Sequence, residues 1–160
     1  MTDVQELVVL VGLQAAGKST FRRHRFDGTH VAVSKDDFPN NRRPARRQEF
    51  LIREALAAGK SVVVDNTNAR TVDREQLVQL AREFQARVVA YFLPARVEES
   101  LARNGRREGR ARVPDVGIFS TAKALVAPSW AEGFDEMYLV TWGSDQDFVV
   151  VPVSRDAHEE

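Results

Sequence analysis

The sequence predicts a three-layer α/β fold, in which a mostly parallel sheet carries helices on both faces and an Arg-rich helical lid closes one edge. Three observations predict it. Short β-branched runs alternate with amphipathic stretches of about ten to fifteen residues, which is the pattern of βαβ units. A glycine-rich turn follows the first run. Five arginines crowd positions 103–112, between the last two amphipathic stretches.

Six short apolar or β-branched runs are the expected strands. They span residues 7–11, 30–34, 62–64, 88–93, 137–142 and 148–151. The amphipathic stretches between them are the expected helices, at residues 17–25, 44–58, 71–85, 96–104 and 114–126. Gly59 is a stop signal after the second helix, and Pro94 ends the fourth strand.

Two of these helices carry clear apolar stripes, which indicate the faces that they bury. The stripe of the helix at 44–58 consists of Phe50, Leu51, Ala55 and Leu56. The stripe of the helix at 71–85 consists of Leu77, Leu80, Ala81 and Phe84.

The amino-acid composition and the net charge exclude several classes of protein and several kinds of site. Apolar residues make up 43% of the chain and charged residues 29%, which excludes a disordered chain, a collagen-like fibre and a coiled coil. The 23 basic and 23 acidic side chains cancel, so no overall field attracts nucleic acid or a membrane. The absence of cysteine excludes disulfides, Cys-ligated zinc and a thiol nucleophile. With no basic leader and no apolar run long enough to span a bilayer, we expect a cytoplasmic protein without a membrane partner.

The glycine-rich turn matches the phosphate-binding motif G-x-x-x-x-G-K-[ST], and it lies between a buried strand and a helix. Its nucleotide-binding residues are Gly12, Leu13, Gln14, Ala15, Ala16, Gly17, Lys18, Ser19 and Thr20. The glycines let backbone N–H groups turn inward around phosphates, and the helix N-terminus adds its positive end. We expect Lys18 to reach the β- and γ-phosphates and the Ser19 hydroxyl to ligate Mg²⁺. The chain is thus expected to be a P-loop NTPase that binds a nucleoside triphosphate.

A P-loop alone does not separate GTPases, motor ATPases and kinases. The sequence has no N-K-x-D guanine motif, and its length leaves few residues for the coupling domains of a motor. We therefore expect a small phosphotransferase that carries its acceptor on the same domain. Residues 1–153 form this expected kinase domain, with the lid at about 103–113, and residues 154–160 form a polar tail.

Carboxylates and amides follow the second and third expected strands, at the sheet edge where the P-loop also lies. Transfer to a hydroxyl needs a carboxylate that accepts its proton. We expect Asp36 to be this base, and Asp37 to contact the substrate or to cap the next helical turn. Asp65 supports Mg²⁺ through water or holds the P-loop in place by hydrogen bonds. We expect the next three residues either to bind substrate or to form a capped turn. They are Asn66, Thr67 and Asn68.

Two arginine clusters complete the candidate site. In the cluster at 103–112, two glycines and the flanking helices favour a lid over the triphosphate, and the alternative is a solvated surface. The second cluster contains Arg42, Arg43, Arg46 and Arg47, and no acid. Cations at a helix N-terminus oppose the helix dipole. This mismatch favours a role in binding an acceptor phosphate or a nucleic-acid backbone.

The chain resembles the kinase domain of the polynucleotide 5'-hydroxyl kinases, both the phage and the animal end-healing enzymes. The similarity runs in order through the P-loop, the S-K-D-D turn at 34–37, V-V-V-D-N-T-N at 62–68, residues 103–114 and A-P-S-W-A-E-G-F at 127–134. The D-N-T-N and A-P-S-W-A-E-G-F segments are more specific than the P-loop, and they look closest to the animal enzyme.

The resemblance implies that Lys18 and Ser19 serve ATP and Mg²⁺, and that Asp36 is the general base on the 5'-hydroxyl. The similarity of R-N-G-R-R-E-G, at 103–109, to the family's lid selects Arg107 as the catalytic arginine. Its neighbours Arg106 and Arg110 are then expected to bind the nucleotide as well.

One position departs from this resemblance. Pro39 stands three residues beyond the expected base, where phage-type enzymes carry an arginine for the acceptor's 3'-phosphate. We expect Arg42 or Arg43 to bind the acceptor instead, with help from Arg46 or Arg47.

The sequence thus predicts an ATP- and Mg²⁺-dependent kinase that phosphorylates a hydroxyl, in the first place the 5'-OH of DNA or RNA. Two alternatives stay open. One is a small-molecule kinase whose acceptor is a sugar, a nucleoside or an antibiotic. The other is an ATP-gated binding module that phosphorylates no acceptor.

Overall fold

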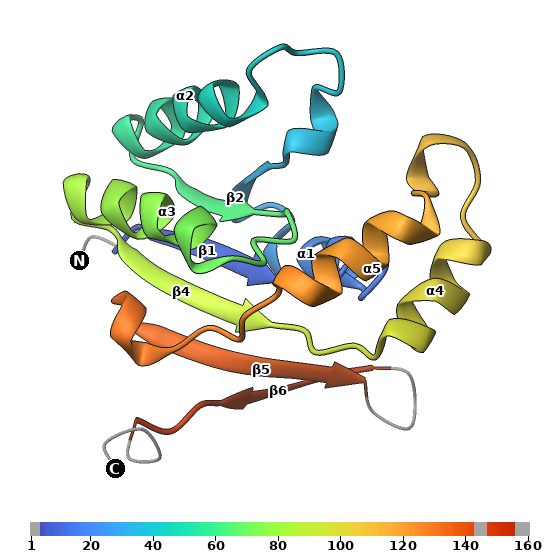
Figure 1. Cartoon of the computed structure of the whole chain (residues 1–160). Coiled ribbons are helices and arrows are strands. Elements are labelled where there is room, and N and C mark those ends of the chain that lie inside the picture. Colours follow the sequence, from blue (N-terminus) through green and yellow to red (C-terminus); the bar gives the residue numbers. More distant parts are fainter. Residues whose placement is uncertain (1–3, 143–146, 156–160) are drawn as a thin grey trace.

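The structure is a computed structural model that describes residues 4–142 and 147–155. Its strands form one six-stranded sheet in the order β2-β3-β1-β4-β5-β6 (Figure 1). All neighbouring strands are parallel except the antiparallel pair β5 and β6, so the prediction of a mostly parallel sheet is confirmed. The strands are β1 (Glu6–Val11), β2 (His30–Val33), β3 (Ser61–Val64), β4 (Arg87–Phe92), β5 (Glu136–Trp142) and β6 (Phe148–Pro152).

The expected helices all form, and their ends differ from the predicted ends by no more than two residues. They are α1 (Lys18–Phe26), α2 (Pro44–Ala57), α3 (Thr71–Glu83), α4 (Val97–Gly105) and α5 (Asp115–Ala124). Three short 3-10 helices were not predicted: η1 (Lys35–Asp37), η2 (Gly109–Ala111) and η3 (Trp130–Glu132). Within residues 4–142 and 147–155, no helix has the length and apolar character needed to cross a bilayer.

The core lies on both faces of the sheet, as a three-layer fold requires. On one face, Ile52 of α2 and Leu77 of α3 pack with the β1 side chains that point toward them. On the other face, Phe21 and Phe26 of α1 pack with the alternate β1 residues. The central strand β1 is therefore covered on both sides, which explains its continuous apolar run.

The apolar stripe predicted for α2 is partly wrong. Phe50 is 53% exposed, whereas the buried face of the helix contains Gln48, Ile52, Ala55 and Leu56. At 3.6 residues per turn, Phe50 lies roughly 200° around the helix from Gln48. The prediction gave weight to an aromatic side chain beside Leu51, but the helix turns Ile52 and Leu56 toward the core, so Phe50 lies on the outward side.

A buried ion pair fixes the segment after α5 to α3. Arg74 is fully buried, and its Nε and Nη2 donate to the two carboxylate oxygens of Glu132 at 2.7 and 3.0 Å. Its Nη1 donates to the backbone oxygens of Asn68, Ala69 and Val126. The A-P-S-W-A-E-G-F segment therefore has a structural role, because its glutamate holds this arginine.

We expect Arg74→Ala to lower the free energy of unfolding by about 3–5 kcal/mol, because the change leaves the carboxylate of Glu132 without its partner. Urea unfolding followed by circular dichroism measures this loss. The double variant Arg74→Met/Glu132→Leu removes both charges, so it should be more stable than Arg74→Ala. Equal losses in the two proteins would show that the uncompensated charge is not the cause.

Candidate active site

The P-loop lies at the carboxyl edge of the sheet, between β1 and α1 (Figure 1). Ala15 and Gly17 have left-handed backbone conformations, with φ of 63° and 98°, as in backbone nests that turn successive N–H groups toward an anion. Position 17 also requires glycine because there is no room for a side chain. A Cβ built there would lie 2.9 Å from the Trp142 ring and 3.3 Å from Arg103 Nη1.

Lys18 is the electrostatic centre of the site. Its side chain is buried, and its Nζ donates to the backbone oxygen of Leu13 at 2.6 Å. The pKa of Lys18 is lowered to about 8, first because the side chain is buried and to a smaller extent because of the charge of Arg107, while the carboxylates of Asp65 and Asp36 oppose this shift. The charge of Lys18 thus interacts with one arginine of the lid and with one carboxylate from each of the two acidic segments.

Ser19 and Asp65 form the candidate magnesium site. Ser19 Oγ donates to Asp65 Oδ2 at 2.8 Å, and Arg22 Nε donates to the same oxygen at 2.9 Å. Mg²⁺ in nucleotide sites is held by one or two oxygen side chains together with phosphates and waters. A serine hydroxyl bonded to a buried carboxylate beside the P-loop fits this requirement. Asp65 also holds the P-loop helix, so both parts of its predicted role are compatible with the geometry.

The two acids lie within the short helix η1. Ser34 caps this turn by accepting a hydrogen bond from the Asp36 backbone N–H, and the roles expected for Asp37 stay a prediction. A hydroxyl two residues before the first acid already satisfies the N–H group that a carboxylate would have capped. The Asp36 side chain is exposed and near enough to Lys18 to act on its pKa.

The segment after β3 ties the acidic turn and the P-loop to the sheet. Asn66 Oδ1 accepts from the Lys35 backbone N–H at 2.9 Å, and its Nδ2 donates to Gln48 Oε1 at 2.5 Å. Asn68 Nδ2 donates to the Leu10 backbone oxygen at 2.7 Å, and the backbone oxygen of Thr67 accepts from Gly12. Both amides therefore have structural partners, and contacts of Asn66, Thr67 and Asn68 with substrate stay a prediction.

The base of the lid is closed by one buried side chain. Asn104 Nδ2 donates to the Val113 backbone oxygen at 2.6 Å, and Asn104 Oδ1 accepts from the Val113 N–H at 2.9 Å. Between these residues, Arg107 Nη1 donates to the Ala111 backbone oxygen at 3.1 Å. The side chain of Arg110 lies outside the described residues, and its predicted role stays a prediction.

The lid and the P-loop enclose a pocket of about 490 Å³. It is lined by Ala15, Gly17, Thr20, Arg103, Arg106, Arg107 and Trp142. Arg106 and Arg107 thus line the same pocket as the P-loop, and their contacts with nucleotide stay a prediction. The Arg103 guanidinium lies 4.7 Å from the centre of the Trp142 ring, so these two residues form one wall.

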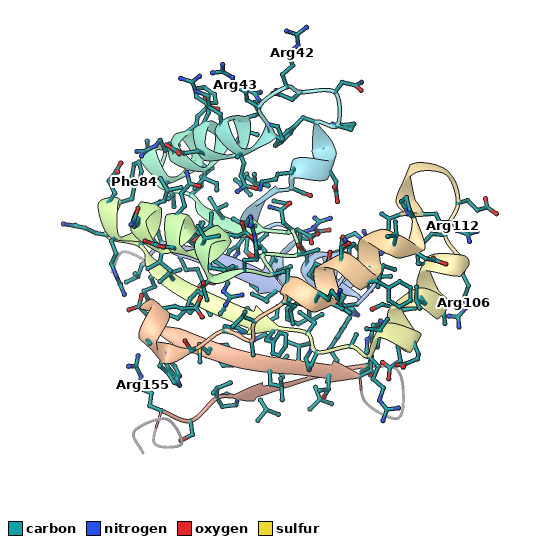
Figure 2. All side chains as sticks on the ribbon, in the orientation of Figure 1. Arg42, Arg43, Phe84, Arg106, Arg112 and Arg155 are labelled. Carbon is teal, nitrogen blue, oxygen red and sulfur yellow. The ribbon has the colours of Figure 1, made fainter. Side chains whose placement is uncertain are left out.

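Arg42 and Arg43 do not face this pocket. Figure 2 shows both side chains extending outward from the segment at the start of α2, away from the sheet. Direct contact with the reacting end of an acceptor is therefore not evident for either residue, and acceptor binding by them stays a prediction.

Comparison with known proteins supports a common origin for these features. A family model described as an AAA domain matches residues 7–125, which include the P-loop, the Asp36 turn and the lid. The chain belongs to this AAA domain family. Its fold is that of a P-loop NTPase, as predicted.

Two curated relatives of this AAA domain are named as kinases. The bifunctional polynucleotide phosphatase/kinase of Schizosaccharomyces pombe is 27% identical over 152 residues, which cover 92% of this chain and 36% of the relative. The L-seryl-tRNA(Sec) kinase of Methanococcus maripaludis is 29% identical over 116 residues, covering 63% of this chain and 46% of the relative. The chain therefore spans less than half the length of either protein.

A solved structure shares the fold of the AAA domain. The AvrRxo1-ORF1:-ORF2 complex with ATP matches with a TM-score of 0.72 at 18% identity, covering 97% of this chain and 62% of that chain.

The sequence interpretation missed one residue of this AAA domain's pocket. Trp142 ends β5, the last of the parallel strands, and the carboxyl end of such a strand lies at the ligand edge of the sheet. That position was the available signal, because an aromatic residue at the end of such a strand can reach a bound ligand.

Proposed function

We propose that this chain is an ATP- and Mg²⁺-dependent kinase that phosphorylates the 5'-hydroxyl of a polynucleotide. One observation carries the proposal. Arg107 of the lid lines the same pocket as Gly17 and Thr20 of the P-loop, so a candidate lid cation lies at the phosphate-binding loop. Asp36 lies in the turn that Asn66 ties to the end of β3, and its charge also acts on the buried Lys18. The likeness to the polynucleotide phosphatase/kinase over 92% of the chain supports a polynucleotide as the acceptor.

In this mechanism, the oxygen of the acceptor hydroxyl attacks the γ-phosphorus, and Asp36 accepts the proton of that hydroxyl. A new O–P bond forms, the bond between the γ-phosphorus and the β–γ bridging oxygen breaks, and ADP leaves. Lys18 and Arg107 stabilise the negative charge of the transferring group. Ser19 and Asp65 would hold Mg²⁺, which when bound neutralises charge on the β- and γ-oxygens.

The test is incubation with γ-labelled ATP, Mg²⁺ and a 5'-OH oligonucleotide. We expect label on the 5' end, and none with a matched oligonucleotide that already carries a 5'-phosphate. Lys18→Met, purified in the same way, controls for contaminating kinases. ATP binding without label on the oligonucleotide would contradict the proposal.

A small-molecule kinase is the second candidate, and Pro39 favours it because this position lacks the arginine of the phage-type enzymes. Salt distinguishes the two. Binding through several phosphates weakens steeply as salt rises, whereas binding of a small neutral acceptor hardly changes. A nucleotide-binding module that transfers no phosphoryl group would bind ATP and label neither acceptor.

The wall formed by Trp142 and Arg103 leads to a prediction about the donor. We expect Trp142→Ala to weaken ATP binding by about fivefold or more, because a base that contacts this wall loses the aromatic part of it. Binding of inorganic tripolyphosphate, which has no base, should not change. Isothermal titration with both ligands measures the difference. Equal weakening of both ligands would instead indicate that Trp142 supports the P-loop through Gly17.

A further inference from the structure

The outward face of α2 carries a basic and aromatic surface that the proposed chemistry does not use. We call it the α2 platform, and it consists of Arg43, Arg46, Arg47 and Phe50. These residues are separated mostly by three or four positions, so their side chains share one side of the helix. All four are exposed.

The arginines of the platform have no close carboxylate partner among the described residues, although the charge of Arg46 acts on neighbouring Glu49 and helps to lower its pKa. Within residues 4–142 and 147–155, none of them forms an ion pair with a carboxylate. Exposed arginines elsewhere on this layer do: Arg53 pairs with Glu49 and Glu83, and Arg82 pairs with Asp135. The first turn of α2 also has no acid, and its N-cap residue makes no side-chain cap. The platform thus concentrates positive charge where like charges and the helix dipole both oppose it.

Phe50 gives this surface a second chemical character. The guanidinium of Arg47 lies 5.4 Å from the centre of the Phe50 ring, and the side chain is 53% exposed. An exposed aromatic ring beside a guanidinium plane suits an unpaired base, because bases stack on both. Free guanidiniums next to the ring suit the phosphates that join such bases.

The platform is tied to the acidic turn. Gln48, the residue that follows Arg47, is buried under α2 and accepts a hydrogen bond from Asn66, which also binds the Lys35 backbone N–H. Asp36 is the next residue. A strand held on the platform would therefore lie at a fixed offset from the candidate base.

We propose that the α2 platform binds a single-stranded nucleic acid several nucleotides from its 5' end, with a base stacked on Phe50 and phosphates held by Arg43, Arg46 and Arg47. This proposal rests on the proposed function, because it assigns a polynucleotide to the acceptor side of that site. It gives Arg43 a role away from the reacting end, consistent with its outward direction (Figure 2).

The test measures binding separately from turnover. Fluorescence anisotropy with 3'-labelled, 5'-OH dodecanucleotides of DNA and of RNA needs no ATP. We expect Phe50→Ala to weaken binding by about fivefold or more, while Phe50→Tyr, which keeps the ring, binds like the wild type. Arg46→Gln and Arg47→Gln should each lower the slope of log K against log salt by about 0.7. Arg23→Gln, which removes an exposed arginine of α1 on the opposite face of the sheet, should leave the slope unchanged.

Wild-type affinity in Phe50→Ala together with wild-type slopes in both arginine variants would overturn the platform. Equal dependence of a blunt duplex on Phe50 would overturn base stacking, because paired bases cannot reach the ring. Phosphorylation assays separate this proposal from the one on which it rests. If Phe50→Ala impairs phosphorylation of the dodecanucleotide but not of a dinucleotide, the platform is supported. If the wild type binds the dodecanucleotide through the platform and transfers no phosphoryl group, the proposed function fails while the platform stands.

Discussion

Replacing Arg107 by alanine is expected to lower kcat for phosphoryl transfer about a thousandfold while the fold stays intact. Arg107 lines the pocket beside the P-loop, and its charge helps to lower the pKa of Lys18. A guanidinium in such a place stabilises the charge that spreads over the transferring phosphoryl group, and loss of a comparable arginine lowers rates by about 10³–10⁵. The described hydrogen bond of its side chain lies within the lid, so its loss should hardly affect the free energy of unfolding.

Steady-state assays with γ-labelled ATP, combined with urea unfolding, measure both quantities. Arg96→Ala is the matched control, because Arg96 is an exposed arginine at the other end of α4 and outside the pocket. Its turnover should equal that of the wild type. Near-normal turnover in Arg107→Ala would exclude the assignment, and a large loss in Arg106→Ala would then transfer the role to that neighbour.

Asp36→Ala should lower kcat about 10²- to 10⁴-fold, because no carboxylate would then accept the proton of the acceptor hydroxyl. The turn itself should persist, since Ser34 bonds the backbone N–H of residue 36 and not its side chain. ATP affinity should therefore change little, and the loss should appear in kcat. Single-turnover kinetics at saturating ATP measure this step directly.

The adjacent acid supplies the control for this prediction. Asp37 lies in the same exposed turn and carries the same charge, so Asp37→Ala changes the local field to a similar extent. We expect its loss in kcat to be much smaller than that of Asp36→Ala, and loss of a substrate contact by Asp37 would appear in KM instead. Equal losses in the two variants would mean that the turn contributes charge rather than a specific base.

Most of the architecture was predictable from the sequence, for physical reasons that can be named. The fully buried strand β1 shows as a β-branched run, and its place before a glycine-rich loop and a helix identifies the P-loop edge. Because β1, β2 and β3 are parallel, their carboxyl ends lie at that same edge. This is why Asp36 and Asp65 could be placed near Lys18 without coordinates.

Other features could not be predicted, because they depend on long-range partners. The buried arginine Arg74 looks like any charged residue of an amphipathic helix until Glu132, which lies 58 positions away, is seen to bind it. On α2, Gln48 is buried and accepts a hydrogen bond from Asn66, whereas Phe50, two residues further on, is exposed. In each case a polar side chain occupies a core position that hydropathy assigns to an apolar residue.

The amide of Asn104 holds the two ends of the arginine loop together, whereas the residues between these ends are free to vary. Because Asn104 and Val113 bond each other through both donor and acceptor, the two ends of the arginine loop meet whatever lies between them. The entropy of closing a loop changes slowly with its length, so residues inside this clamp can be inserted, deleted or exchanged at small thermodynamic expense. The loop between Asn104 and Val113 can thus be replaced as a unit. Loops of other lengths and charges, grafted between α4 and α5, would let donor and acceptor preference diverge on an unchanged scaffold.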